Sequence, residues 1–219
     1  MKLKALTFKE SGLTKPEWNA LKKLKTPEKI QDYLNSLPFN FEKRGETHRS
    51  VKESLKAKEI HCFEGALVAA AALWIQGRKP LILDLCAIRP DFDHVVTLFE
   101  KDGHWGAISK TNHSVLRYRD PIYRSVRELV MSYFHEYFLD DGTKSLRRHS
   151  KPYDLSRLGT YWIHTDENLA PLAYKLDRSA HEDILNKKQI KGLRKAEEIE
   201  VEATAETEWS PGKIRLNFK

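Results

Sequence analysis

The run of residues from Cys62 to Gln76, CFEGALVAAAALWIQ, constrains the fold more than any other part of the chain. Ala and Leu dominate this run, both are strong helix formers, and Gly77 follows as a natural terminating residue. Because small apolar side chains cover nearly the whole circumference, we expect a buried helix that packs closely against other elements. The run is far shorter than the roughly 20 residues of a membrane span.

Strand patterns follow this helix. The Asp102-Gly103 turn signal separates two of the candidates, and helices and one further strand are expected later in the chain. The predicted strands are Leu81–Ile88, His94–Lys101, Trp105–Lys110, a shorter SVLRYR segment at 114–119, and Gly159–His164. The predicted helices after the first are Ser125–Phe138 and Asn168–Leu176. This pattern predicts an α+β fold in which the apolar helix packs on an antiparallel sheet.

The length of 219 residues fits one large domain with appendages rather than two full-size domains. Residues 1–58 are expected to be an N-terminal helical portion, since Thr14 and Thr26 each precede a Pro at an early helical position. Residues 59–180 are expected to form the core domain. Residues 181–219 are highly charged and are expected to be solvated helix or a loosely held tail.

The charge balance is basic but dispersed. There are 38 Lys and Arg residues against 31 Asp and Glu residues, a net charge of +7, and the two signs are interleaved. No zinc-finger spacing, RNA-recognition motif or basic heptad region occurs, so a dedicated nucleic-acid-binding protein is not expected. The N-terminal MKLKALTFKESG has no apolar run of a secretory signal, and a cytoplasmic protein that does not engage a membrane is expected.

Two cysteines cannot form a disulfide framework, so each needs its own explanation. Cys86 lies inside an apolar strand pattern and is expected to pack in the core. No C-x-x-C or H-x-x-x-H spacing occurs, so neither a metal site nor a cofactor is expected.

Cys62 stands at the first turn of the apolar helix, where the positive end of the helix dipole stabilises a thiolate. His94 begins a predicted strand 32 residues later. If that strand lies against the helix N-terminus, His94 supplies an imidazolium beside the sulfur. The amide N–H groups of the same helix turn would then form an oxyanion hole. Glu64 lies two residues after Cys62, and its negative charge would raise the pKa of the thiol. The Glu64 side chain is therefore expected to point away, to pair with an Arg or to bind substrate.

In order, element type and spacing, the stretch from Cys62 to about Tyr123 resembles the transglutaminase-like branch of the papain-like superfamily. The similarity lies in HCFEGALVAAAALWIQGRKPLILDL, DHVVTLFEKDGHWGAI and RYRDPIY, under a third of the chain. It implies a papain/transglutaminase-like core with extra N- and C-terminal helices. It also implies that Cys62 is the nucleophile and that His94 is the general base and acid.

The third catalytic member departs from that family, because GAISKTN after Trp105 contains no acid. A three-residue loop at Asp102–His104 would place Asn112 opposite His94, and its side-chain carbonyl could orient the imidazole as in a papain-type Cys-His-Asn set. Asp120 is the alternative. A simple meander would place it about eight residues, or roughly 25 Å, from His94.

Two functions are consistent with these residues. The first is an enzyme in which Cys62 attacks the amide or ester carbonyl of a peptide or amide substrate, forms an acyl-enzyme and passes the acyl group to water or an amine. The alternative is a non-catalytic member of the fold that binds an acidic partner or nucleic acid through its basic surface.

Overall fold

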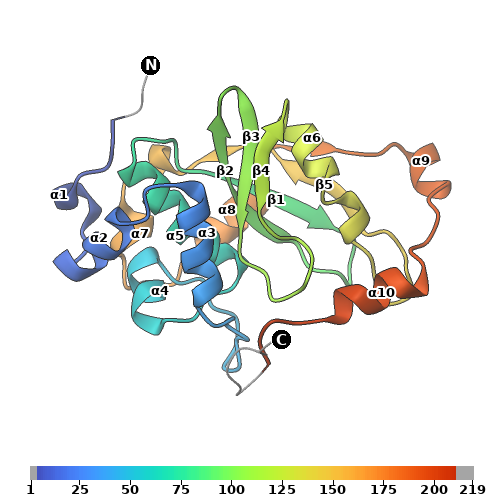
Figure 1. Ribbon diagram of the computed structural model, residues 1–219, viewed down its shortest axis with the longest axis horizontal. Helices are drawn as coiled ribbons and strands as arrows, with labels where there is room; N and C mark the ends of the chain where they lie inside the picture. Colours follow the sequence, from blue (N-terminus) through green and yellow to red (C-terminus); the bar gives the residue numbers. More distant parts are fainter. Residues whose placement is uncertain (1–3, 211–219) are drawn as a thin grey trace.

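The structure is a computed structural model that describes residues 4–210. It is an α+β fold built on a seven-stranded antiparallel sheet (Figure 1) with the strand order β4-β3-β2-β1-β5-β7, in which β6 pairs with β1 beside this path. The strands are β1 Leu81–Ala87, β2 His94–Lys101, β3 His104–Ser109, β4 Arg119–Tyr123, β5 Leu146–Ser150, β6 Tyr153–Asp154 and β7 His181–Asp183.

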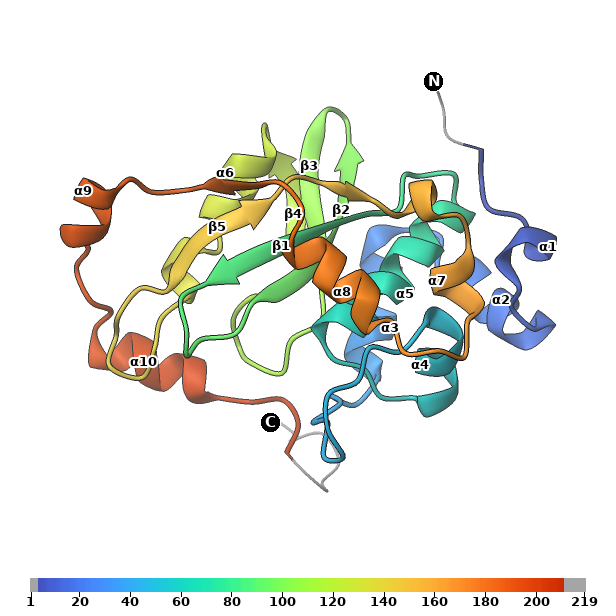
Figure 2. The same ribbon diagram turned by 180° about the vertical axis from the view of Figure 1, so that it is seen from behind.

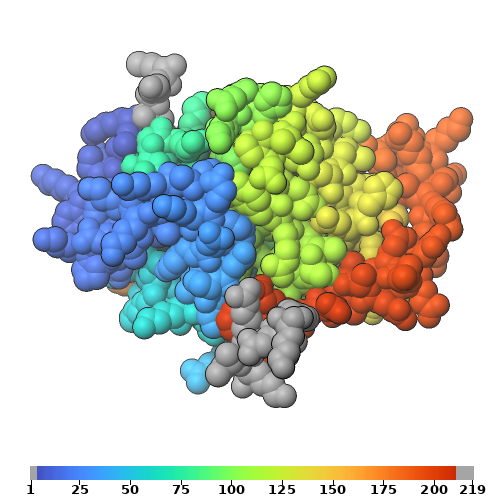
Figure 3. All heavy atoms as spheres, viewed as in Figure 1, coloured from blue at the N-terminus to red at the C-terminus, as the bar shows by residue number. Residues whose placement is uncertain are grey.

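The apolar run forms α5 (Cys62–Ile75), confirming the expected helix, and every residue from Phe63 to Ile75 is buried. The helix lies against β1, β2 and β3 on one side and against the helices α2, α3, α4 and α7 on the others. These helices and their neighbour α1 gather at one end of the molecule (Figures 1 and 3). Their bounds are α1 Phe8–Ser11, α2 Lys15–Lys22, α3 Pro27–Ser36, α4 Val51–Ala57 and α7 Tyr161–His164.

The other face of the sheet has its own apolar core. Leu83, Leu85, Val96 and Leu98 alternate with the residues that face α5, as the two-residue period of a strand requires. Helical elements α6 and η1 cover this face and bury Leu129 and other apolar side chains. The remaining helical elements are α6 Val126–Met131, η1 Phe134–Glu136, η2 Leu155–Leu158, α8 Ala170–Asp177, α9 Lys187–Lys191 and α10 Glu198–Ala205.

Three predicted elements differ from the structure. The Gly159–His164 segment is not a strand, because Thr160 begins a short helix, α7, that buries Trp162 and Ile163. Only the last residue of the SVLRYR segment belongs to a strand, and the predicted 125–138 helix is interrupted between α6 and η1. Local propensity missed these three because packing against the core decides short segments.

The charged segment after His181 is not a loose tail within the described residues. β7 adds to the edge of the sheet beside β5, and Trp209 is buried. The part of the predicted tail beyond residue 210 lies outside the described residues.

The hairpin between β2 and β3 has a two-residue loop, not the three-residue loop predicted from the sequence. Lys101 pairs with His104, and Asp102 and Gly103 have φ angles of 51° and 76°. Two consecutive positive φ angles are typical of the type I′ turn that Asp-Gly favours. The predicted register is therefore wrong by one residue, and Ser109, the last residue of β3, pairs with Val96.

Within residues 4–210, no helix is both long enough and apolar enough to span a bilayer.

Candidate active site

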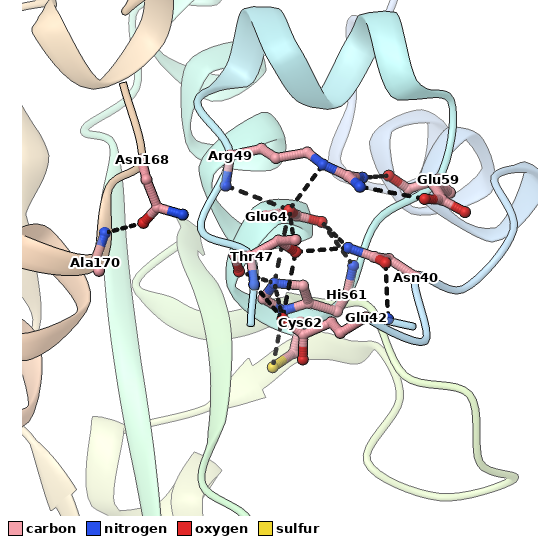
Figure 4. A network of polar contacts seen from close by, with 10 residues as sticks. All are labelled: Asn40, Glu42, Thr47, Arg49, Glu59, His61, Cys62, Glu64, Asn168 and Ala170. Atoms are coloured by element: carbon pink, nitrogen blue, oxygen red, sulfur yellow. Dashed lines mark hydrogen bonds and ion pairs between the residues drawn. The ribbon is translucent and has the colours of Figure 1, made fainter. Parts of the chain in front are cut away.

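Cys62 is the first residue of α5, and its side chain is partly exposed to solvent. The helix directs the unpaired N–H groups of its first turn, and hence its positive dipole end, toward this position. Figure 4 shows the sulfur at the edge of a polar network formed by α5 and the preceding loop. The sequence therefore places the thiol where an anion is favoured.

His61, the residue before the helix, lies beside the sulfur. Its Nδ1 is 4.0 Å from Cys62 Sγ, and its Nε2 donates to the carbonyl of Thr47 at 2.7 Å. Carboxylate oxygens of Glu42 and Glu64 each lie 3.7 Å from the same Nε2. Burial lowers the pKa of His61, but its hydrogen bond to Cys62 and the charges of Cys62 and Glu64 raise that pKa to about 9.

Glu64 is fully buried, and the structure explains how its charge is accommodated. Its carboxylate accepts hydrogen bonds from the amide of His61 and from the side chains of Asn40 and Thr47. The guanidinium of Arg49 lies 3.7 Å away (Figure 4). Of the three alternatives left open by the sequence, pairing with an Arg is the one observed. The carboxylate thereby ties the loop before α5 to the first turn of the helix.

His94 starts β2 and is buried. Its Nε2 lies 2.7 Å from the hydroxyl of Ser109, and that hydroxyl donates to the carbonyl of Leu116 at 2.5 Å. Because the hydroxyl proton is used on Leu116, the His94 ring must donate Nε2–H to Ser109 Oγ. Nδ1 of His94 remains for the hydrogen bond with Cys62, and it donates that bond to the thiolate when the ring is protonated.

The two imidazoles act together on the thiol. Burial alone raises the pKa of Cys62, but side-chain hydrogen bonds from His61 and then His94, with the charges of both rings, hold the pKa well below its usual range. A thiolate flanked by two imidazoles is a nucleophile at neutral pH. The structure thus brings together Cys62 and His94, two of the four residues singled out in the sequence.

The structure does not bring Asn112 or Asp120 to the His94 ring. The side-chain amide of Asn112 donates to the carbonyl of Trp209 and accepts from its backbone N–H, at 3.0 and 2.8 Å. Asp120 lies on β4 beside Arg119, which pairs with Ala107. The paired position of Ala107 and Arg119 lies about four residues, or roughly 13 Å, along the hairpin from His94.

Ser109 and the hydrogen-bond network of His61 were not predicted from the sequence. The signal for Ser109 was present in the Asp-Gly turn. A two-residue loop puts Ser109 opposite Val96, on the face that Val96 shares with His94, and side chains at such diagonal positions can contact. The signal for the full His61 network was weaker, because Glu42 and Thr47 belong to a loop without periodicity.

A surface hollow of about 530 Å³ adjoins this network. Its lining includes Glu42 and Thr47, both of which contact His61, together with the basic side chains of Lys43 and Arg44. Cys62 is not among its lining residues. The hollow therefore borders the His61 side of the site and not the sulfur itself.

A comparison with models of known protein families finds no match. A search of curated protein sequences also finds none.

Proposed function

We propose that this chain is a cysteine-nucleophile enzyme with a papain-like core similar to the transglutaminase-like branch. Its reaction would be acyl transfer from an amide or ester carbonyl through a thioester at Cys62. The observation that supports this most strongly is the placement of the Cys62 thiol at a helix N-terminus beside the imidazoles of His61 and His94, whose hydrogen bonds and charges lower its pKa. A buried structural cysteine needs none of these features.

The two histidines have different roles in this proposal. His61 carries a pKa of about 9 and lies near two carboxylates, so it remains protonated at neutral pH and stabilises the thiolate as a counter-ion. His94 is held by a neutral hydroxyl instead. It is therefore the ring that exchanges a proton with the reacting groups during turnover.

In the acylation step, the Cys62 thiolate forms a bond to the carbonyl carbon, and the carbonyl electrons move to oxygen. Amide N–H groups of the first turn of α5, which have no acceptor within the helix, donate to this oxyanion. The tetrahedral adduct collapses and expels the amine or alkoxide, which takes the Nδ1 proton of the His94 imidazolium and leaves that ring neutral. A thioester remains on Cys62.

In the second step, water or an amine gives a proton to His94 and attacks the thioester carbonyl. The carbon–sulfur bond breaks, the acyl product leaves, and the thiolate returns between the two rings. The choice of water makes the enzyme a peptidase or amidase, and the choice of an amine makes it an acyl transferase.

The activated ester p-nitrophenyl acetate tests this proposal directly. Incubation should acetylate the peptide containing Cys62, as located by mass spectrometry, with a burst of p-nitrophenolate equal to the protein concentration. Cys62→Ala should abolish the burst, and His94→Ala should slow it by about 10²- to 10⁴-fold, the usual range for loss of a general base. His113→Ala, which changes an exposed ring outside the site, is the matched control.

Acetylation confined to lysines, with no burst that depends on Cys62, would refute the enzyme and favour a binding module with the same fold. A basic binding module should in addition bind acidic polymers with an affinity that falls steeply as salt rises.

A further inference from the structure

A second cluster of reactive side chains lies on the sheet. It consists of Asp84 and Cys86 on β1 and His181 on β7, whose candidate ligand atoms all lie within 4.8 Å of one another. The side chains of Asp84 and His181 are 1% and 4% exposed, and Cys86 is buried. The mechanism proposed above uses none of them.

The register of the sheet explains why residues so far apart in sequence meet. Asp84 and Cys86 are two residues apart on β1 and share a face. Ser150 on β5 pairs with His181 on β7, and its hydroxyl accepts from the amide of Asp84 at 2.9 Å. The three side chains therefore converge on one face of three neighbouring strands, of which β1 and β5 are seen side by side in Figure 2.

One carboxylate oxygen is shared by the other two groups. Asp84 Oδ2 lies 3.1 Å from the sulfur of Cys86 and 3.3 Å from Nε2 of His181. Around a tetrahedral Zn²⁺, bond lengths of about 2.0–2.1 Å to O and N and about 2.3 Å to S place ligand atoms about 3.3 Å (O to N) and about 3.5 Å (O to S) apart. The observed O–N separation matches that of ligands around a single zinc ion, and the O–S separation is somewhat shorter.

The ring of His181 is oriented as a metal ligand requires. Its Nδ1 donates to the carbonyl of Ser179 at 2.7 Å. A backbone carbonyl on Nδ1 fixes the tautomer in which Nε2 carries a lone pair, the arrangement found behind most metal-binding histidines. Nε2 is the atom that faces Asp84.

The carboxylate of Asp84 also has an unused oxygen. Its Oδ1 is buried, and no hydrogen-bond donor reaches it within the part of the chain that the structure describes. A buried carboxylate oxygen without a donor costs free energy unless a cation compensates it.

We propose that Asp84, Cys86 and His181 bind a zinc ion. The mixed O, S and N donor set suits Zn²⁺, which accepts all three ligand types in tetrahedral geometry. Three protein ligands leave the fourth position to a water molecule. Because the ligands come from β1 and β7 with β5 between them, the ion would clamp the edge of the sheet. This inference does not depend on the proposed enzymatic function.

The test uses the Cys62→Ala protein, in which the other cysteine-histidine group has lost its sulfur. After treatment with a chelator and dialysis, the protein is loaded with zinc chloride, and bound zinc is measured by elemental mass spectrometry. We expect about one zinc per chain. Adding His181→Ala or Cys86→Ala should reduce the zinc retained by at least tenfold.

His149→Ala is the matched control. His149 is a buried histidine on β5 that pairs with Leu85, so its side chain lies on the opposite face of the sheet from Asp84. Its removal deletes the same ring from the same sheet and should leave zinc binding intact.

Cobalt provides a readout that needs no substitution in the proposed site. Loading the Cys62→Ala protein with Co²⁺ should produce a sulfur-to-metal charge-transfer band together with the intense visible bands of four-coordinate cobalt. Zinc retention that His181→Ala does not reduce, or a cobalt spectrum without the thiolate band, would overturn the proposal. The cobalt spectrum requires no substitution in the site, so it decides the question even if the site variants fail to fold.

Discussion

Replacing Ser109 with Ala tests the observed geometry of the site most sharply. Ser109 is 2% exposed, accepts the Nε2–H of His94 and donates to the carbonyl of Leu116. Alanine removes both interactions and leaves a buried ring donor and a carbonyl without their partner. Each such unsatisfied group costs about 1–3 kcal/mol.

If the free-energy cost of one unsatisfied group opposes the reactive orientation of the His94 ring, acylation of Cys62 should slow by about 5- to 150-fold. About 1.4 kcal/mol corresponds to a tenfold change in rate. The assay is single-turnover acetylation by p-nitrophenyl acetate, and urea unfolding measures the accompanying loss of stability. Ser54→Ala is the control, because its buried hydroxyl on α4 has no hydrogen-bond partner among residues 4–210. That variant should retain the full rate and at least the original stability.

An unchanged acylation rate in Ser109→Ala would refute the role assigned to this hydroxyl. The same conclusion would follow if Asn112→Ala slowed acylation more than Ser109→Ala did.

Three further predictions follow from the site. Asn112→Ala should lower the free energy of unfolding by about 1–3 kcal/mol, because two backbone groups of Trp209 lose their partner. The acylation rate should change less than twofold, and a large rate loss would contradict a purely structural role for Asn112. Glu64→Gln should lower the pKa of His61 below about 9, as followed by the NMR titration of its ring, because a nearby negative charge is lost; an unchanged pKa would argue against this coupling. In Cys62→Ala the pKa of His61 should fall below about 9 in the same NMR titration, because the hydrogen bond and the charge of Cys62 that raise it are lost; an unchanged pKa would exclude the ion pair.

The features predicted well from the sequence are those in which one residue pattern determines both local structure and burial. The α5 run is apolar on all sides and can only be a central helix. The β2 run predicted its strand to the residue, and the Asp-Gly pair predicted the turn that follows it. The sequence also predicted His94 at the start of β2, where the structure brings its ring to Cys62.

The features predicted poorly depend on register or on distant contacts. A one-residue change in loop length exchanges the faces of a strand. The predicted three-residue loop therefore placed Asn112 opposite His94, whereas the observed loop places Ser109 opposite Val96. The link between Asn112 and Trp209 spans 97 positions, and the contact between Asp84 and His181 spans the same number. Neither pair has a local pattern that would reveal it.

Because His61 and His94 flank Cys62, its side chain should be a thiolate at neutral pH. The most direct measurement is its rate of alkylation by iodoacetamide as a function of pH, with peptide mapping to distinguish it from Cys86. Alkylation at pH 6 should be rapid at Cys62 and slow at Cys86, because burial raises the pKa of the Cys86 thiol. A rate for Cys62 that rises with an ordinary thiol midpoint near about pH 8.5 would contradict it.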